Sequence, residues 1–139
     1  MPTATPYQQR IVTKFGRSSD RKTGFWPNTK PGIRSWISSL ETLSRLNATT
    51  IIPGHGEVQH DQTYLNLVLI SLQTIHGQVQ AALQRGLTLK QTQQSVNLDA
   101  IRVQFTHDDP KLNASFDGNF FPIIRQMYDE ETEGLELYQ

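Results

Sequence analysis

Residues 49–58 of this chain read TTIIPGHGEV, and this stretch decides the predicted fold. Its first four residues, 49–52, form a short β-branched run that stops at Pro53, as is typical of a buried strand. The run is followed by a loop in which His55 has a glycine on each side, and glycine allows the backbone to turn sharply. We therefore expect a strand over 49–52 with His55 at its C-terminal end, its imidazole directed away from the main apolar cluster toward an open face.

Helices are predicted on both sides of this stretch. Apolar residues recur every three or four positions over 33–46, which predicts a helix with one apolar face. A long helix is predicted from about 61 to 85, with Asp61 as its cap and Gly86 as its stop. The order helix, strand, glycine-rich loop indicates an α/β fold in which helix outweighs strand.

Further helices are predicted beyond residue 87. Thr88 begins a capping box with Gln91, which predicts a short helix through about residue 96. Asn97 can cap another short helix, and Pro110 suits the first position of a last one. That last helix is expected to end near residue 128.

The last helix and the two ends of the chain are predicted to be less regular. Gly118 and Pro122 should weaken or kink the helix. Segment 129–136 is acidic and is expected to be solvated. In the polar N-terminal segment, Phe25 and Trp26 are expected to lie against the fold or a partner. We therefore divide the chain into an irregular arm (1–32), a first structured part (33–60), a helical C-terminal extension (61–128) and an acidic tail (129–139).

The composition excludes several classes of function. Thirteen basic and thirteen acidic residues cancel, so no overall charge attracts nucleic acid or an anionic membrane. The chain has no cysteine, which excludes disulfides, thiolate metal sites and cysteine nucleophiles. No run is apolar enough for a signal peptide or long enough to span a membrane. The chain is therefore expected to be soluble, and cytoplasmic by default.

His55 is the candidate metal ligand of the glycine-rich loop. Imidazole nitrogen suits zinc or iron, and the end of a strand holds a histidine more rigidly than a long loop does. A structural histidine in a tight turn explains the same loop equally well when the loop is taken alone. The two interpretations differ in exposure, because a structural histidine would be buried with both ring nitrogens hydrogen-bonded.

The order of these elements resembles the C-terminal half of metallo-β-lactamase-fold hydrolases. The likeness runs over about residues 33–128 and is specific around Pro53-Gly54-His55-Gly56. It implies that residues 33–60 are the C-terminal part of an αββα metallo-β-lactamase sandwich and that a helical tail follows. It also implies that His55 is the last ligand of a two-zinc site, which activates water against an ester, amide, thioester or phosphoester.

The rest of that family's metal site is missing from the chain. The motif His-x-His-x-Asp-His does not occur, and Asp20 lies in polar surroundings that do not fit the aspartate bridging the two metals. A catalytic metal needs about three protein ligands and an open position for water. The chain alone is therefore expected to bind zinc weakly or not at all, to have no catalytic residue of its own and to lack hydrolase activity.

The other histidines favour structural roles. His60 precedes the capping Asp61 and is expected at the surface. His76 follows an apolar position of the long helix and is expected to be partly buried or at the surface. His107-Asp108-Asp109 could bind a cation, but a cap ahead of Pro110 explains Asp109 more simply.

Two functions remain open from the sequence. In the first, the chain is the C-terminal fragment of a zinc-dependent hydrolase, and its partner is the missing N-terminal half. In the second, it is a non-catalytic helical protein-interaction module, in which an uncovered apolar face binds a partner or a second copy of the chain.

Overall fold

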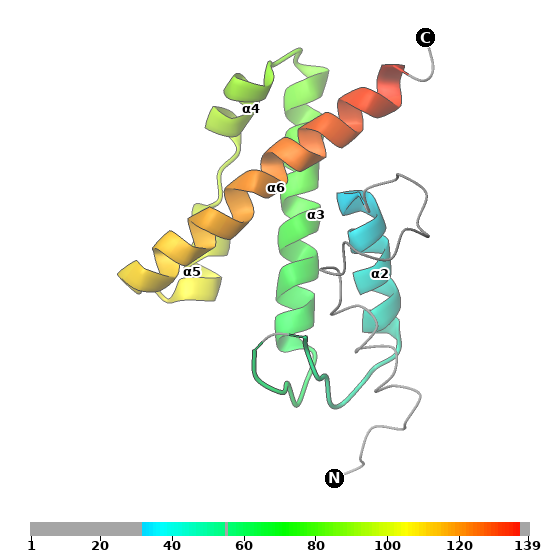
Figure 1. The fold of residues 1–139 in the computed structure, drawn as a ribbon, viewed down its shortest axis with the longest axis vertical. Helices are drawn as coiled ribbons and strands as arrows, with labels where there is room; N and C mark the ends of the chain where they lie inside the picture. Colours follow the sequence, from blue (N-terminus) through cyan, green and yellow to red (C-terminus); the bar gives the residue numbers. More distant parts are fainter. Residues whose placement is uncertain (1–31, 55, 137–139) are drawn as a thin grey trace, which may run out of the picture. The chain divides into compact units, whose positions relative to one another are not determined.

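The computed structural model describes residues 32–54 and 56–136 (Figure 1). Their helices are α2 (Ile33–Arg45), α3 (Thr63–Gln84), α4 (Leu89–Ser95), α5 (Asp99–Thr106) and α6 (Pro110–Glu136). No strand occurs in this described part of the chain. The described residues fall into two compact units: unit 1 holds residues 36–54 and 56–69, and unit 2 holds residues 32–35 and 70–136.

The predicted α/β fold is wrong for the residues that the structure describes. In place of a strand over 49–52 there is an isolated antiparallel bridge, in which Ile51 and Gln59 exchange two backbone hydrogen bonds of 2.8 Å. A strand needs a longer ladder, and Pro53 has no N–H with which to extend this one. A single bridge cannot form half of an αββα sandwich, so the predicted sandwich is wrong as well.

The two helices predicted around that stretch are confirmed. The bounds of α2 and α3 differ from the predicted bounds by one or two residues. At the start of α3, Asp61 Oδ1 accepts a hydrogen bond of 2.8 Å from the backbone N–H of Thr63, which lowers the pKa of the Asp61 carboxyl. At its end, Gly86 adopts a φ of 71°, the left-handed conformation that favours glycine.

The capping box predicted for the next helix, α4, is confirmed. The Thr88 hydroxyl accepts a hydrogen bond from the Gln91 backbone N–H, and the Gln91 side-chain oxygen accepts one from the Thr88 N–H. For α5 the N-cap position is Leu98, whose side chain makes no capping hydrogen bond, and the predicted cap Asn97 lies one residue earlier. Asn97 Oδ1 still accepts a hydrogen bond of 2.8 Å from the backbone N–H of Asp99, the first residue of the helix. Local caps of this kind involve residues two or three positions apart, so they can be recognised in a sequence.

Helix α6 is longer and more continuous than predicted. It passes through Gly118 and Pro122 without a break and reaches Glu136, so it does not end near residue 128, and residues 129–136 belong to it. Pro122 has no N–H to donate to the Gly118 carbonyl, but both residues are exposed and water can satisfy that carbonyl. The helix therefore tolerates this proline on its solvent side.

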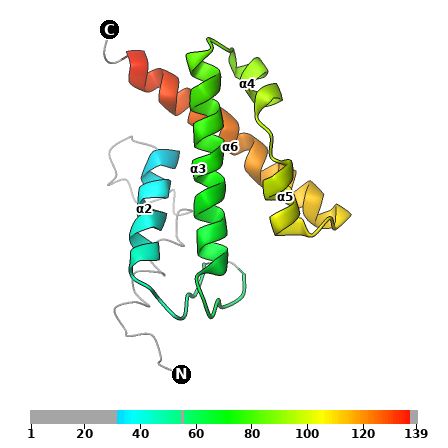
Figure 2. The ribbon, with the colours of Figure 1, turned by 180° about the vertical axis from the view of Figure 1, so that it is seen from behind.

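Unit 2 is built around the crossing of α3 and α6. In Figure 1 α6 passes in front of α3, and in the opposite view of Figure 2 it passes behind. Helices α4 and α5 both contact α6. Five fully buried apolar side chains come from the two crossing helices: Leu72, Ile75, Val79, Ile124 and Met127. Within each helix these residues are three or four positions apart, so those of α3 share one face of α3 and those of α6 share one face of α6.

Unit 1 has a smaller core. Its buried apolar side chains are Ile37, Leu40, Ala48 and Leu69. The Ser44 hydroxyl lies 3.1 Å from Asn66 Oδ1 and donates to it, which joins the end of α2 to the start of α3. The loop between these helices carries the glycine-rich stretch that the sequence singled out.

Candidate functional site

The predicted metal ligand His55 lies outside the described residues, so its exposure and its partners stay predictions. Among residues 32–54 and 56–136, no group of three or more His, Asp or Glu side chains could together hold a metal ion. The residue after His55, Gly56, has a φ of 96°. The loop therefore turns sharply where its glycines predicted a turn.

The other polar residues singled out by the sequence have the expected structural roles. His60 is exposed at the surface. His107 and Asp108 have φ values of 47° and 62°, and His107 ends α5. Asp109 Oδ1 accepts hydrogen bonds from the first backbone N–H groups of α6, at 2.8 and 3.3 Å. The cap interpretation of Asp109 is confirmed.

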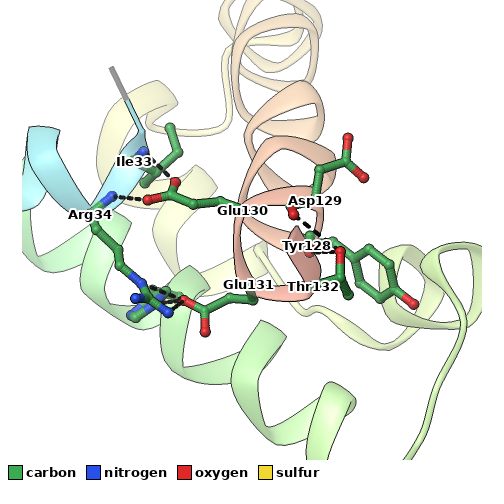
Figure 3. Close-up of polar contacts among 8 residues, drawn as sticks. Ile33, Arg34, Tyr128, Asp129, Glu130, Glu131 and Thr132 are labelled. Atoms are coloured by element: carbon green, nitrogen blue, oxygen red, sulfur yellow. Dashed lines mark hydrogen bonds and ion pairs between the residues drawn. The ribbon is translucent and has the colours of Figure 1, made fainter. Parts of the chain in front are cut away.

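A cluster of charged side chains in unit 2 joins residues that are far apart in the sequence (Figure 3). Glu131 Oε1 accepts a hydrogen bond of 2.7 Å from Arg34 Nε. The same oxygen lies 2.7 Å from His76 Nε2, which can donate to it as a neutral or a protonated ring. The Glu131 side chain is only 11% exposed. One partly buried carboxylate oxygen thus links α2, α3 and α6.

The neighbouring carboxylate, Glu130, caps the N-terminus of α2. Its Oε2 accepts a hydrogen bond of 2.7 Å from the Ile33 backbone N–H, and its Oε1 accepts a longer one of 3.4 Å from the Arg34 N–H. The first N–H groups of a helix have no partner within it, and a negative charge at that end is favourable. Glu130 and Glu131, with Arg34, His76 and the Ile33 amide, form what we call the carboxylate cluster.

The cluster holds Glu131 in its ionised form. Burial raises the pKa of this carboxyl, but the hydrogen bonds from Arg34 and His76 lower it by more, so the pKa lies below its usual value. The same contact with Glu131 raises the pKa of the Arg34 guanidinium. The cluster therefore stabilises unit 2 as an ionised network.

The sequence did not reveal this cluster, because its two halves lie about a hundred residues apart and the acidic run looked solvated. The Ile33 amide and the Glu130 carboxylate are separated by 97 positions. One signal was present: Ile124, Met127 and Glu131 continue a spacing of three and four, which places Glu131 on the buried face of α6. His76 is half-buried, as expected from its place in the long helix.

Gly32 is predicted to be essential for the position of Glu130. A Cβ at residue 32 would overlap the Glu130 carboxylate, and the φ of Gly32 is not one that disfavours other residues. Gly32→Ala should therefore displace the Glu130 carboxylate and lower the free energy of unfolding by about 1 kcal/mol, the usual effect of a lost helix cap. Urea denaturation followed by circular dichroism measures this.

The matched control for that prediction is the same substitution in a Glu130→Ala background. Without the carboxylate there is nothing to displace, and alanine restricts the unfolded chain more than glycine does, so Gly32→Ala should be neutral or stabilising by up to about 1 kcal/mol. Equal destabilisation in both backgrounds would contradict the proposed contact.

Aromatic side chains form a second cluster, between α5 and α6. The rings of Phe116 and Phe120 stack with centroids 4.3 Å apart, and Phe105 lies 5.7 and 5.3 Å from them. Arg102 lies over the Phe116 ring at 5.7 Å and donates two hydrogen bonds to Asp117 Oδ1. These contacts fix α5 on α6.

The side of α6 opposite its buried residues is open. In Figure 1 no other helix of unit 2 lies in front of α6. We call this side the outer face of α6, and its residues fall within about a third of the helix circumference at 100° per residue. It consists of Lys111, Ala114, Ser115, Gly118, Phe121, Pro122, Arg125 and Asp129. The Phe121 ring, 41% exposed, is its largest apolar group.

Comparison with known proteins gives no relative: no family model, no curated protein and no solved structure matches this chain. The resemblance to metallo-β-lactamase-fold hydrolases is therefore wrong, because the described residues form helices without the strands of that sandwich. The descriptions of the chain as a hydrolase and as a zinc protein depended on that resemblance and lose their support.

Among the residues that the structure describes, none of the helices combines the length and apolar character needed to cross a membrane. This agrees with the sequence, in which no such run was found.

Proposed function

We propose that this chain is a helical protein-interaction module that binds another polypeptide through the outer face of α6. The observation that carries the proposal is the exposure of Phe121 on that face. An aromatic ring supplies a large apolar area with few rotatable bonds, so such rings are favoured at protein–protein contacts.

The other apolar groups of the outer face support this role. Ala114, Gly118 and Pro122 surround Phe121 on the same side of the helix, and all three are exposed. Small side chains let a second helix approach closely, and the ring of Phe121 would then bury its exposed part. Meanwhile Phe116, Ile124 and Met127 hold the opposite side of α6 in the core of unit 2. The outer face is thus presented on a fixed element.

A photo-crosslinking experiment tests this function. Phe121 is replaced by the photoreactive residue p-benzoylphenylalanine in the full chain, which is expressed in the cells that naturally make it and irradiated. A polypeptide that contacts the outer face should yield an adduct of discrete mass. Gln104, which is exposed on α5 of the same unit, is the control position and should yield none. Absence of an adduct from position 121, or an equal adduct from position 104, would refute the proposal.

A further inference from the structure

We infer that the partner of the outer face is a second copy of this chain, whose α6 pairs antiparallel so that Lys111 lies opposite Asp129 of the second copy. The inference rests on the proposed function, because it uses the same surface. It is carried by the positions of the two opposite charges on α6.

Lys111 and Asp129 lie on the same side of α6, Lys111 in its first turn and Asp129 seven residues before its end. They are eighteen residues apart, which is five turns of 3.6 residues, or roughly 27 Å along the axis. In an antiparallel pair with a twofold axis near Phe120, each Lys111 therefore meets the Asp129 of the other copy. A twofold contact forms both of these ion pairs at once.

The charges also select between the two possible orientations. A parallel pairing of the same faces would place Lys111 beside Lys111 and Asp129 beside Asp129. Like charges placed opposite one another across an interface disfavour that arrangement. The antiparallel pairing removes both repulsions and replaces them with attractions.

Asp129 keeps the capacity to bind a lysine of the second copy. Within one chain its Oδ2 lies 3.7 Å from Arg125 Nε, and both side chains are about half exposed or more. Exposed ion pairs of this kind contribute little to stability, so the contact with Arg125 does not prevent Asp129 from binding a lysine of the second copy. In the antiparallel register Arg125 lies opposite Ser115 of the second copy. The residue that directly faces Arg125 therefore carries no positive charge.

The middle of the outer face can accept the second helix at short range. Apart from its chain neighbours and the backbone of its own helix, no atom of the chain lies within 4 Å of the place where a Cβ on Gly118 would stand. In the antiparallel register Gly118 faces Pro122 of the second copy, and Phe121 lies beside it. The Gly118 carbonyl lacks its usual helix bond because Pro122 has no N–H, so it can accept a hydrogen bond from a polar side chain of the second copy.

Charge exchange tests the pairing by sedimentation equilibrium of the full chain. The wild type should dimerise, and Lys111→Glu or Asp129→Lys alone should raise the dimer Kd roughly tenfold, because each change creates two like-charge contacts. The double variant should regain most of the wild-type affinity. Lys90→Glu makes the same change of charge at an exposed site of α4 and should leave the Kd unchanged. No rescue in the double variant would overturn the register.

Introduced cysteines test the orientation, since the chain has none of its own. In the antiparallel pair, a cysteine introduced by Ser115→Cys in one copy lies opposite a cysteine introduced by Arg125→Cys in the other. In a parallel pair, each introduced cysteine would instead lie opposite the same position of the second copy. Oxidation of a mixture should therefore give mainly the mixed disulfide, because disulfides form only between Cα atoms about 4.4–6.8 Å apart. Predominant self-linkage of either variant would show a parallel dimer and overturn the inference.

The two proposals fail in different ways. A chain that stays monomeric at all concentrations, yet gives a photo-adduct from position 121 with another polypeptide, refutes the second copy as partner and keeps the interaction module. If position 121 gives no photo-adduct at all, both the interaction module and the second copy as its partner are refuted. An adduct of twice the chain mass, together with charge rescue, supports both.

Discussion

Replacing Ile75 with alanine is expected to lower the free energy of unfolding of unit 2 by about 2–5 kcal/mol. Ile75 is fully buried in the middle of α3. The change removes apolar atoms from a packed core and leaves a cavity that neighbouring side chains fill only in part. Chemical denaturation monitored by circular dichroism gives the difference directly, provided that the unfolding slope stays unchanged.

Ile70 supplies a matched control on the same helix. Its side chain is 59% exposed, against 0% for Ile75, and the chemical change is identical. Ile70→Ala should alter stability by no more than about 0.5 kcal/mol, and alanine's better helix propensity should offset part of any loss. If the two variants were destabilised equally, the orientation of α3 in unit 2 would be wrong.

The second large effect is expected for Glu131→Gln. The neutral amide cannot form an ion pair with Arg34 or offer His76 a charged acceptor, and hydrogen bonds to charged groups are the stronger ones. Because Arg34 is more than half exposed and screened by water, we expect a loss of about 1–2 kcal/mol at neutral pH. Thermal and urea unfolding at pH 7 measure this loss.

The pH dependence of that loss follows from the lowered pKa of Glu131. A carboxyl whose pKa is lower in the folded chain than in the unfolded chain stabilises the fold above its unfolded pKa. This contribution is lost as the pH falls through the folded pKa, where the carboxyl becomes protonated. The difference between wild type and Glu131→Gln should therefore shrink toward acid pH. Glu133→Gln, at an exposed site two residues away, should leave the stability at pH 7 nearly unchanged.

The sequence predicted the helices well because their signals are local. The apolar period of 33–46, the capping box of Thr88 and the cap at Asp109 each involve neighbours within one or two turns. The strand over 49–52 failed because a strand depends on a partner elsewhere in the chain, and here a single residue, Gln59, pairs with it. β-Branched composition alone did not supply that partner.

The candidate site could be predicted only in part. Exposure of Phe121 depends on which side of α6 faces α3, and the kink expected at Pro122 obscured the continuous period of that helix. The carboxylate cluster was missed for a different reason: the acidic composition of 129–136 resembles a solvated surface, and the spacing that places Glu131 on the apolar face of α6 does not reveal its partners. Only the fold brings Arg34 and His76 to Glu131.

The cap that Glu130 places on α2 has a consequence for the order in which this protein matures during synthesis. The amides at the start of α2 leave the ribosome long before residue 130 is added to the chain. Until then the first turn of α2 depends on water for its hydrogen bonds, and it can fray. The end of α2 that is made first is thus completed by a residue 97 positions later in the chain, so nascent chains arrested before α6 should expose this turn to proteases that the released protein resists.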